Sequence, residues 1–331
     1  MLVRMVLVLS RKDVESVLTM KDTLVAVENA FRELSLGSVE MPHRLTTRVN
    51  KYSGLIECMP AFIGGIDALG MKLISAYVEN PSKYNLPMTL ATILLADPKT
   101  GALVAMMDGT FLTAMRTGAV CGVASKYLAR EDAQTVGIFG TGTQGRTQLM
   151  GLKEVRKLRE VKAYDVIPEN SRKFAKEMTE RLGITVNPVT NPRDAVMGSD
   201  IVITSTTSKV PVFNGNWLKD GAHVNAIGSH QPGTSELDEA TIRRAKVVVD
   251  QKEACLKEAG DLVDLISKGA ISADHIYGEL GDLVTGKKKG RTSNTEITVF
   301  KSVGLAIQDI ATAKTVFERA QAKGIGKTVE I

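Results

Sequence analysis

The sequence is poor in aromatic residues, histidine and cysteine. Phe, Trp and Tyr make up 5% of the chain, which is too sparse for the stacking platforms of proteins that bind single-stranded nucleic acid. None of the four histidines belongs to an HExxH or similar ligand pattern, so we expect no metal site. The three cysteines, Cys58, Cys121 and Cys255, lie far apart and form no CxxC pair. We therefore expect reduced, buried thiols rather than disulfides or zinc ligands.

The chain also lacks a long hydrophobic run and a concentrated charge of one sign. The apolar stretch at 1–9 is interrupted by Arg4 and is too short to span a membrane, so we interpret it as a first β-strand. The formal net charge of +5 comes from 42 basic and 37 acidic residues spread along the chain. The one dense basic run, Lys287–Arg291, is typical of a solvated loop. These features favour a soluble, cytoplasmic protein that binds neither membranes nor nucleic acid.

The first third of the chain predicts two helices followed by strands. Ser10 is placed to cap a short helix, and a longer helix over 22–36 carries an apolar stripe that ends at Gly37. From Arg44 the apolar period becomes two, which predicts strands. The predicted strands are 44–49, 55–59, 71–78, 89–95 and 103–107. Helices followed by an antiparallel meander indicate an α+β module, from which a helix over 110–128 leads away.

The next part of the chain alternates between strand and helix patterns. The predicted strands are 135–139, 161–164, 201–204, 223–227 and 246–249, and the predicted helices are 144–157 and 171–181. This alternation predicts a parallel sheet with helices on both faces. A long amphipathic helix is predicted over 295–320 and is expected to return to the first module. We therefore expect one discontinuous domain, 1–128 with 305–331, and a second domain over 129–304.

A glycine-rich turn follows the predicted strand that ends at Phe139. Its sequence is Gly140-Thr141-Gly142-Thr143-Gln144-Gly145. Gly140 permits a tight turn, Gly142 lets the backbone approach a pyrophosphate, and Gly145 lets the helix pack closely on the strand. The free N–H groups at the start of the helix attract the anion. With a strand before it and a helix after it, the motif predicts a Rossmann-type site for a nicotinamide dinucleotide.

Asp165 ends the next predicted strand, 25 positions after Gly140. A carboxylate at this place accepts hydrogen bonds from the ribose hydroxyls of the adenosine. Its negative charge repels a 2′-phosphate, so we expect NAD rather than NADP. Arg172 and Lys173 lie just downstream and could soften that preference, although a solvated start of a helix is the favoured interpretation of both.

Three basic residues, Arg44, Lys72 and Arg116, have mostly apolar neighbours. Hydride transfer needs an anchor for the charged groups of the substrate and a group that donates or accepts a proton. Lys72 lies in an apolar strand pattern, where a lysine is either an edge-strand solubility device or a functional cation. Arg116 offers the planar fork that captures a carboxylate. Taken singly, each is also typical of a surface or salt-bridge residue.

Several segments together resemble the ornithine cyclodeaminase/μ-crystallin family, from about residue 10 to about residue 320. The segments are Met41–Arg44, Glu57–Pro60, Gly70–Lys72, Leu112–Ala119, the turn at Gly140, Asn225–Gly228, Glu258–Asp261, Gly290–Ser293 and Ile297–Ser302. The resemblance implies an α/β fold: a Rossmann-type doubly wound parallel sheet plus a discontinuous α+β domain. That second domain is expected to bind substrate and to pair into a homodimer.

The resemblance also implies roles for individual residues. Arg44, Lys72 and Arg116 match positions that hold the carboxylate of an amino acid, with Lys72 also near the reacting centre. The positions that match cofactor contacts are Thr89, Thr117, Thr143, Gln144, Asp165, Thr206, Ile227, Gly228 and Ser229.

The sequence departs from the cyclodeaminases at two matching positions. Where they carry an aspartate, the proposed proton acceptor in amino-acid oxidation, this chain has His230 in Gly228-Ser229-His230. A cofactor-contacting lysine of the cyclodeaminases corresponds to Thr234. Glu57, in contrast, matches an acidic residue that cyclodeaminases carry. His230 could move a proton itself, because imidazole titrates near neutral pH, but a histidine that only bonds a loop fits equally well. Glu57 is likewise compatible with an exposed strand carboxylate.

The leading hypothesis is an NAD(H)-dependent oxidoreductase that acts at the Cα–N bond of a small L-amino acid or its cyclic imine. It would be a ketimine (pyrroline-2-carboxylate) reductase or an alanine-like amino-acid dehydrogenase. Arg44 and Arg116 would hold the substrate carboxylate, and Lys72 would polarise it and assist proton transfer. Glu57 or His230 would exchange the proton on nitrogen.

The sequence is also compatible with two alternative functions. In an ornithine cyclodeaminase, NAD is reduced and reoxidised while ornithine is converted to proline and ammonia; Glu57 supports this activity and His230 weakens it. The other alternative is a non-catalytic protein that binds NAD(P)H and a ligand. The presence of Lys72 and both arginines argues against a non-catalytic role.

Overall fold

The computed structural model describes residues 5–331, which divide into two compact units. Unit 1 holds the chain up to Arg116 and again from Leu305, and unit 2 holds Thr117–Gly304. The boundary lies inside a helix, α3 (Thr110–Leu128), whereas the sequence placed it after residue 128. No helix in residues 5–331 combines the length and the apolar composition that a membrane span needs.

Unit 1 is built on an eight-stranded sheet with the order β16-β1-β7-β6-β5-β4-β2, and β3 also pairs with β4. The strands are β1 (Met5–Leu9), β2 (Val39–Glu40), β3 (Leu45–Val49), β4 (Gly54–Ile63), β5 (Ala68–Tyr77), β6 (Thr89–Ala96), β7 (Leu103–Asp108) and β16 (Lys327–Glu330). The run from β4 to β7 is the predicted antiparallel meander. The strand expected over 1–9 is β1, and its first four residues lie outside the described residues.

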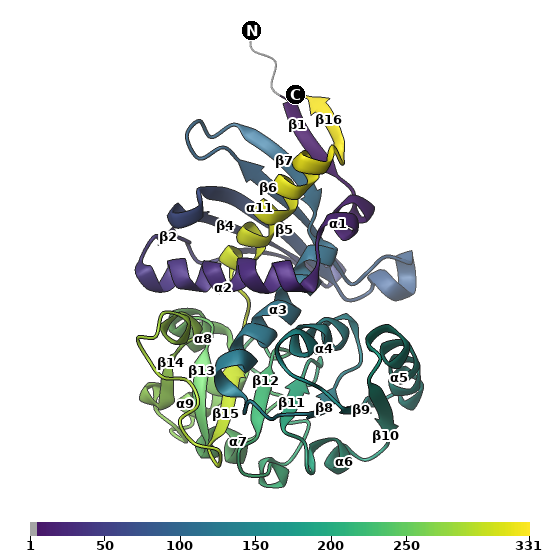
Figure 1. The fold of residues 1–331 in the computed structure, drawn as a ribbon, viewed down its shortest axis with the longest axis vertical. Coiled ribbons are helices and arrows are strands. Elements are labelled where there is room, and N and C mark those ends of the chain that lie inside the picture. The colour runs from purple at the N-terminus through teal and green to yellow at the C-terminus, as the bar shows by residue number, and fades with distance from the viewer. Residues whose placement is uncertain (1–4) are drawn as a thin grey trace. The chain divides into compact units, whose positions relative to one another are not determined.

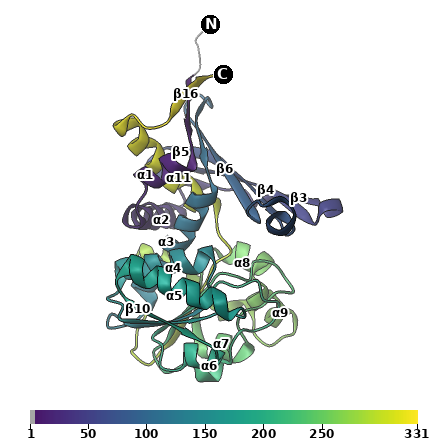
Figure 2. The same ribbon diagram turned by 90° about the vertical axis from the view of Figure 1, so that its right-hand side faces the viewer.

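Helices cover one face of this sheet. They are α1 (Arg11–Val17), α2 (Met20–Leu36) and α11 (Ala306–Lys323). Ser10 and Asp13 form a capping box at the start of α1, and Gly37, with φ of 78°, ends α2, as predicted. The last helix, α11, packs on β4, β5 and β6 and runs beside α2 (Figure 1). Figure 2 shows the three helices together on one side of the strands.

Unit 2 is an eight-stranded parallel sheet with the order β10-β9-β8-β11-β12-β15-β13-β14. The strands are β8 (Thr135–Phe139), β9 (Glu160–Tyr164), β10 (Thr185–Val189), β11 (Ile201–Thr204), β12 (His223–Ala226), β13 (Ala245–Val249), β14 (Ile276–Glu279) and β15 (Ile297–Lys301). The chain runs outward from β8 to β10 and then restarts at β11 on the other side of β8. In open parallel sheets, ligands bind at the carboxyl ends of the strands at such a switch point.

Helices cover both faces of the parallel sheet, as predicted. They are α4 (Thr143–Val155), α5 (Pro168–Leu182), α6 (Pro192–Val196), α7 (Glu239–Arg244), α8 (Lys252–Glu258), α9 (Gly260–Ser267) and α10 (Leu280–Val284). In Figure 1, α4 and α5 lie above the strands and α6 and α7 lie below them. Val136, Ile138, Leu149, Val161 and Phe174 belong to the apolar core that α4 and α5 close over the sheet.

The helix predicted over 295–320 is wrong in its first part. Ile297–Lys301 forms β15, which lies between β12 and β13, and the helix begins only at Ala306. All five residues of β15 are buried. A strand covered on both faces shows no alternation, so its apolar run cannot be distinguished from a buried helix by periodicity. Gly304, with φ of +82°, separates the strand from the helix.

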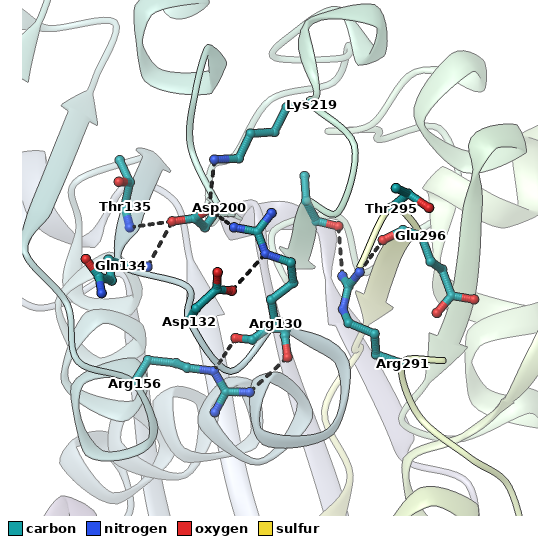
Figure 3. A network of polar contacts seen from close by, with 12 residues as sticks. Arg130, Asp132, Gln134, Thr135, Arg156, Asp200, Lys219, Arg291, Thr295 and Glu296 are labelled. Carbon is teal, nitrogen blue, oxygen red and sulfur yellow. Dashed lines mark hydrogen bonds and ion pairs between the residues drawn. The ribbon is translucent and has the colours of Figure 1, made fainter. Parts of the chain in front are cut away.

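Three arginines fix the far end of α3 within unit 2 (Figure 3). Arg156 donates to the carbonyl oxygens of Ser125, Ala129 and Arg130. Arg130 pairs with Asp200 at 2.8 Å, while Arg291 donates to the carbonyl oxygens of Leu128 and Ala222. The last carbonyls of a helix lack partners within it and carry partial negative charge, so guanidinium groups stabilise them.

Candidate active site

Lys72 lies on β5, in the middle of the unit 1 sheet, and its side chain is buried. Its Nζ atom lies 2.5 Å from Oδ2 of Asp309, on α11. Because β5 pairs with β4 on one side and β6 on the other, Lys72 is not an edge-strand solubility device. Its partner is a buried carboxylate, and the predicted role of Lys72 as a functional cation stays a prediction.

Asp309 also contacts the second predicted anchor, Arg116. Its Oδ1 lies 3.0 Å from Nε of Arg116, whose side chain is 9% exposed. Gln308, the neighbour of Asp309 on α11, accepts a hydrogen bond from Nη1 of Arg116. One buried carboxylate therefore holds two cationic side chains that come from β5 and α3. The structure brings Lys72 and Arg116 together through a residue that the sequence interpretation did not select.

Burial lowers the pKa of Lys72 well below the usual value of a lysine. Burial lowers the pKa of Lys72 from 10.5 to about 8, Asp309 opposes that shift, and the nearby charges of Arg116 and Arg44 add to it. A lysine with such a pKa exists in both protonation states in the neutral to mildly basic range. It can therefore hold a carboxylate as a cation and exchange a proton at little cost.

Arg44, whose charge acts on Lys72, forms an ion pair with Glu57. Nη1 of Arg44 lies 3.4 Å from Oε2 of Glu57, and the hydroxyl of Thr46 donates to Oε1 of the same carboxylate. Pairing of Thr46 with Glu57 across β3 and β4 sets this geometry. Both charged side chains are partly buried, at 14% and 19% exposure. The predicted proton-exchanging role of Glu57 stays a prediction.

Asp309 and Gln308 are the residues in contact with Lys72 and Arg116 that sequence reasoning missed. They are adjacent polar residues inside an otherwise apolar helical stretch, 306–311, and both are fully buried. That interruption was a usable signal, because a buried carboxylate needs a partner. The partner could not be named from the pattern, since Lys72 lies 237 positions away in the sequence.

The glycine turn of unit 2 has the geometry of an anion site. Gly140 has φ of +87°, and a Cβ there would stand 2.6 Å from the carbonyl oxygen of Ser205. Gly142 is the N-cap of α4 and supplies no side chain to its free N–H groups. No atom lies within 4 Å of the place where a Cβ of Gly142 would stand, and α4 has no acidic residue in its first turn. The buried Oε1 of Gln144 has no hydrogen-bond partner among the described residues.

These features fit a pyrophosphate, because the N–H groups at the start of α4 are left to an anion and the backbone is open where it would approach. Arg146 in the first turn of α4 helps to shape the turn. It pairs with Glu177 at 2.7 Å and donates to the carbonyl oxygens of Thr141 and Gly142.

Asp165 anchors the glycine turn from the end of β9. Its Oδ2 accepts hydrogen bonds from the N–H and the hydroxyl of Thr141, at 3.0 and 2.7 Å. Its Oδ1 accepts from the N–H of Ile167 at 3.0 Å. Burial opposes ionisation, but the hydrogen bonds from Ile167 and Thr141 outweigh it and lower the pKa of Asp165. The carboxylate is thus negatively charged at neutral pH, and its contact with a ribose stays a prediction.

The other predicted cofactor positions fall into two groups. Thr206 follows β11, and Ile227, Gly228 and Ser229 follow β12, so they lie at the carboxyl ends of adjacent strands beside the switch point. Thr117 lies on α3, where the backbone of its neighbour Gly118 approaches Thr147 of α4 too closely to admit a Cβ.

Two further predicted residues are Thr89 and His230. Thr89 begins β6 and belongs to unit 1, and its predicted cofactor contact stays a prediction. His230 is exposed and its Nδ1 lies 2.8 Å from the carbonyl oxygen of Gly228. Proton transfer by His230 stays a prediction. The residues 5–331 contain no group of three or more His, Cys, Asp or Glu side chains that could hold a metal ion, and the three cysteines are free.

The model of the ornithine cyclodeaminase/mu-crystallin family matches residues 4–324. The chain belongs to this family. Among solved structures, this family member resembles a Thermococcus litoralis Δ1-pyrroline-2-carboxylate reductase in complex with NADH and L-proline. The two are 48% identical with a TM-score of 0.95, over 98% of this chain and 100% of that chain.

Alanine dehydrogenases are also similar to this family member. An archaeal alanine dehydrogenase dimer with bound NAD is 38% identical with a TM-score of 0.94, over 98% of this chain and 99% of that chain. The alanine dehydrogenase of Archaeoglobus fulgidus is 39% identical over 324 residues, which is 98% of each chain.

Proposed function

We propose that the protein is an NAD(H)-dependent oxidoreductase that interconverts the imine and the amine at Cα of a small amino acid carrying one carboxylate. Suitable substrates are a cyclic imine such as Δ1-pyrroline-2-carboxylate, or the imine formed from pyruvate and ammonia. Unit 2 would bind the dinucleotide and unit 1 the substrate. The observation that carries the proposal is the pairing of Lys72 and Arg116 on the single buried carboxylate of Asp309.

The charge balance of unit 1 supports a substrate with one carboxylate. The cluster contains three cations, Arg44, Lys72 and Arg116, and two carboxylates, Glu57 and Asp309. One positive charge is left over, which one substrate carboxylate neutralises. Desolvated charges are stable only when paired, so a second carboxylate on the substrate would be unfavourable here.

Reduction of an imine requires a hydride at carbon and a proton at nitrogen. A bound nicotinamide dinucleotide supplies the hydride. Arg116, fixed by Asp309 and Gln308, orients the substrate through its carboxylate. Lys72, with a pKa of about 8, polarises that carboxylate and assists the proton transfer. The similarity to proteins solved with NADH or NAD supports the cofactor, and Asp165 supports NAD over NADP because its charge repels a 2′-phosphate.

We also propose that two copies pair through the open face of the unit 1 sheet. Leu73 on β5, Leu90 on β6 and Met106 on β7 alternate with buried residues, and they are 36%, 37% and 39% exposed. An apolar patch across neighbouring strands is typical of an interaction surface. The dimer of the archaeal alanine dehydrogenase supports a second copy as the partner. A single mass corresponding to the monomer in light scattering at micromolar concentration would contradict pairing.

A spectrophotometric screen tests the activity. Oxidation of NADH is followed with Δ1-pyrroline-2-carboxylate, with pyruvate plus ammonia and with oxaloacetate plus ammonia, and each is repeated with NADPH. We expect turnover with the first two and with NADH in preference to NADPH. Ornithine is tested with NAD for release of ammonia, which would instead indicate a cyclodeaminase. Tight binding of NADH without turnover of any substrate would indicate a non-catalytic binding protein.

A further inference from the structure

Glu236 is a fully buried carboxylate of unit 2 that lies between β12 and α7. Its Oε1 accepts a hydrogen bond from the N–H of Thr206 at 2.6 Å. Its Oε2 accepts from the N–H of Gly228 at 2.6 Å and from the hydroxyl of Thr204 at 2.9 Å. The two oxygens of one side chain thus hold the backbone directly after β11 and directly after β12.

These two backbone segments lie beside the glycine turn. Strand β11 pairs with β8, and the residue after its end, Ser205, donates its N–H to the carbonyl oxygen of Phe139. The segments after β11 and β12 also touch each other, because a Cβ on Gly228 would overlap the carbonyl oxygen of Thr206. Thr206 and Gly228 are two of the positions expected to contact the cofactor. Glu236 itself faces the backbone with both oxygens and has no oxygen left to face a ligand.

A second buried pair holds Glu236 in place. Oδ1 of Asp261 accepts from the N–H groups of Glu236 and Leu237, at 2.6 and 2.9 Å. Oδ2 of Asp261 lies 2.7 Å from Nζ of Lys301, and both side chains are fully buried. Burial raises the pKa of Glu236, while the charge of Lys301 opposes that rise. The carboxylate is therefore supported by a charge that comes from the end of β15.

We propose that Glu236 is a positioning residue for the coenzyme, which sets the Thr206 and Gly228 segments in the geometry that receives the nicotinamide half. The proposal rests on the dinucleotide function proposed above. Segments that are already ordered before binding lower the entropic cost of binding, because the ligand does not have to order them. An amide cannot replace the carboxylate, because each oxygen accepts from a backbone N–H and an amide has only one acceptor oxygen.

Asp200 provides a matched control at the opposite end of the same sheet. Its Oδ2 accepts from the N–H groups of Gln134 and Thr135, both at 2.9 Å, and Oδ1 pairs with Arg130. Asp200 directly precedes β11 and Thr135 begins β8. It is thus a buried carboxylate that holds two backbone N–H groups at the amino ends of the strands, away from the carboxyl ends where a ligand binds.

The test compares binding of NADH and of ADP, which carries the adenosine and pyrophosphate but no nicotinamide. NADH is followed by its fluorescence and ADP by calorimetry, on the wild type, Glu236→Gln and Asp200→Asn. We expect Glu236→Gln to raise the Kd for NADH at least about tenfold and to change the Kd for ADP by less than about twofold. We expect Asp200→Asn to leave both constants within about twofold, although it lowers the midpoint of thermal unfolding.

Unchanged NADH binding in Glu236→Gln, or an equal loss of NADH and ADP binding, overturns the proposal. Wild-type protein that binds neither ligand instead contradicts the dinucleotide function, so the two failures are distinguishable. If Glu236→Gln does not fold, Thr204→Val replaces it, because valine fits a buried strand and only the hydroxyl donated to Glu236 is lost. That variant should raise the Kd for NADH about threefold with ADP binding unchanged, and unchanged NADH binding there counts against the proposal.

Discussion

Nζ of Lys72 and Oδ2 of Asp309 lie 2.5 Å apart, and their side chains are 1% and 0% exposed. Burying two charges costs several kcal/mol of desolvation for each ion, and their mutual attraction only partly offsets that cost. Removing one partner of such a pair lowers the free energy of unfolding by about 3–5 kcal/mol, because the other charge stays buried without a partner. An apolar pair of similar volume would serve stability as well. Asp309 also holds Arg116, so one buried carboxylate is shared by two cations of unit 1.

The first prediction concerns the pH dependence of substrate binding. Lys72 is cationic below its pKa of about 8 and loses its charge as the pH rises through that value. The KM for the substrate should therefore rise about tenfold per pH unit above the pKa. In Asp309→Asn the opposing carboxylate is gone while the charges of Arg116 and Arg44 remain. The pKa of Lys72 then falls further, and the rise in KM begins at lower pH.

Asp22→Asn is the control for this shift. Asp22 pairs with Arg319, which is also on α11 but ten positions from Asp309, about 15 Å along the helix. Steady-state kinetics between pH 6 and pH 10 are compared for the three proteins. One contrary result is a rise in KM at basic pH that begins at the same pH in Asp309→Asn as in the wild type, and another is an equal shift of that rise in Asp22→Asn. Either result would show that Asp309 does not set the charge of Lys72.

The second prediction concerns the arginine fork. Arg116→Lys keeps the positive charge but loses the planar geometry that contacts Asp309 through Nε and Gln308 through Nη1. We expect the KM for the substrate to rise about 10–100-fold, because a point charge does not reproduce bidentate recognition. The Kd for NADH should not change. Arg319→Lys in the same unit should leave both constants unaltered, and a comparable rise in its KM would assign the effect to loosening of α11.

Alanine substitutions at two glycines of the turn should distinguish effects on NADH binding from effects on stability. Gly142 has ordinary backbone angles and open space around it, so Gly142→Ala should change the free energy of unfolding by no more than about 1 kcal/mol. The added methyl stands where a pyrophosphate approaches, so the Kd for NADH should rise at least about tenfold.

Gly140→Ala should instead lower the free energy of unfolding, by about 1–3 kcal/mol or more. Gly140 has φ of +87°, and the added Cβ would stand 2.6 Å from the carbonyl oxygen of Ser205. Urea unfolding and NADH fluorescence are measured on both variants. Unaltered NADH affinity in Gly142→Ala would contradict the placement of the pyrophosphate at this turn.

The local signals of the sequence were strong enough to place most of the fold. The capping box at Ser10, the stop at Gly37 and the glycine turn before α4 involve residues within one turn of each other, so their geometry follows from neighbouring residues. The helix over 110–128 and the strands over 135–139 and 201–204 were predicted with the bounds that the structure has.

The failures occurred where the structure depends on distant partners. The strands β10, β14 and β16 lie at sheet edges, and β16 forms by pairing with β1 at the opposite end of the chain. The buried strand β15 shows no alternation, which led to its prediction as helix. In the site, Arg44, Lys72 and Arg116 were selected, but Asp309 and Glu236 were not, because each is defined by contacts with residues distant in sequence.

The last prediction concerns Arg156, which serves the fold of unit 2 rather than its chemistry. Its Nε donates to the carbonyl oxygen of Arg130 at 2.8 Å, and its Nη2 donates to those of Ser125 and Ala129 at 2.8 and 2.9 Å. Lysine cannot reach three carbonyls from one plane, so Arg156→Lys should lower the free energy of unfolding by about 2–4 kcal/mol.

The same change in an exposed arginine provides the comparison for Arg156→Lys. Arg172→Lys alters an ion pair with Glu169 whose side chains are 59% and 74% exposed, and it should change stability by less than about 0.5 kcal/mol. The folded Arg156→Lys protein should keep the Kd for NADH, since the arginine donates to the carbonyl oxygen of Ser125 at the end of α3. Urea unfolding followed by circular dichroism measures the free energy of unfolding of both variants. Loss of NADH affinity at full folding would show that the end of α3 is coupled to the coenzyme site.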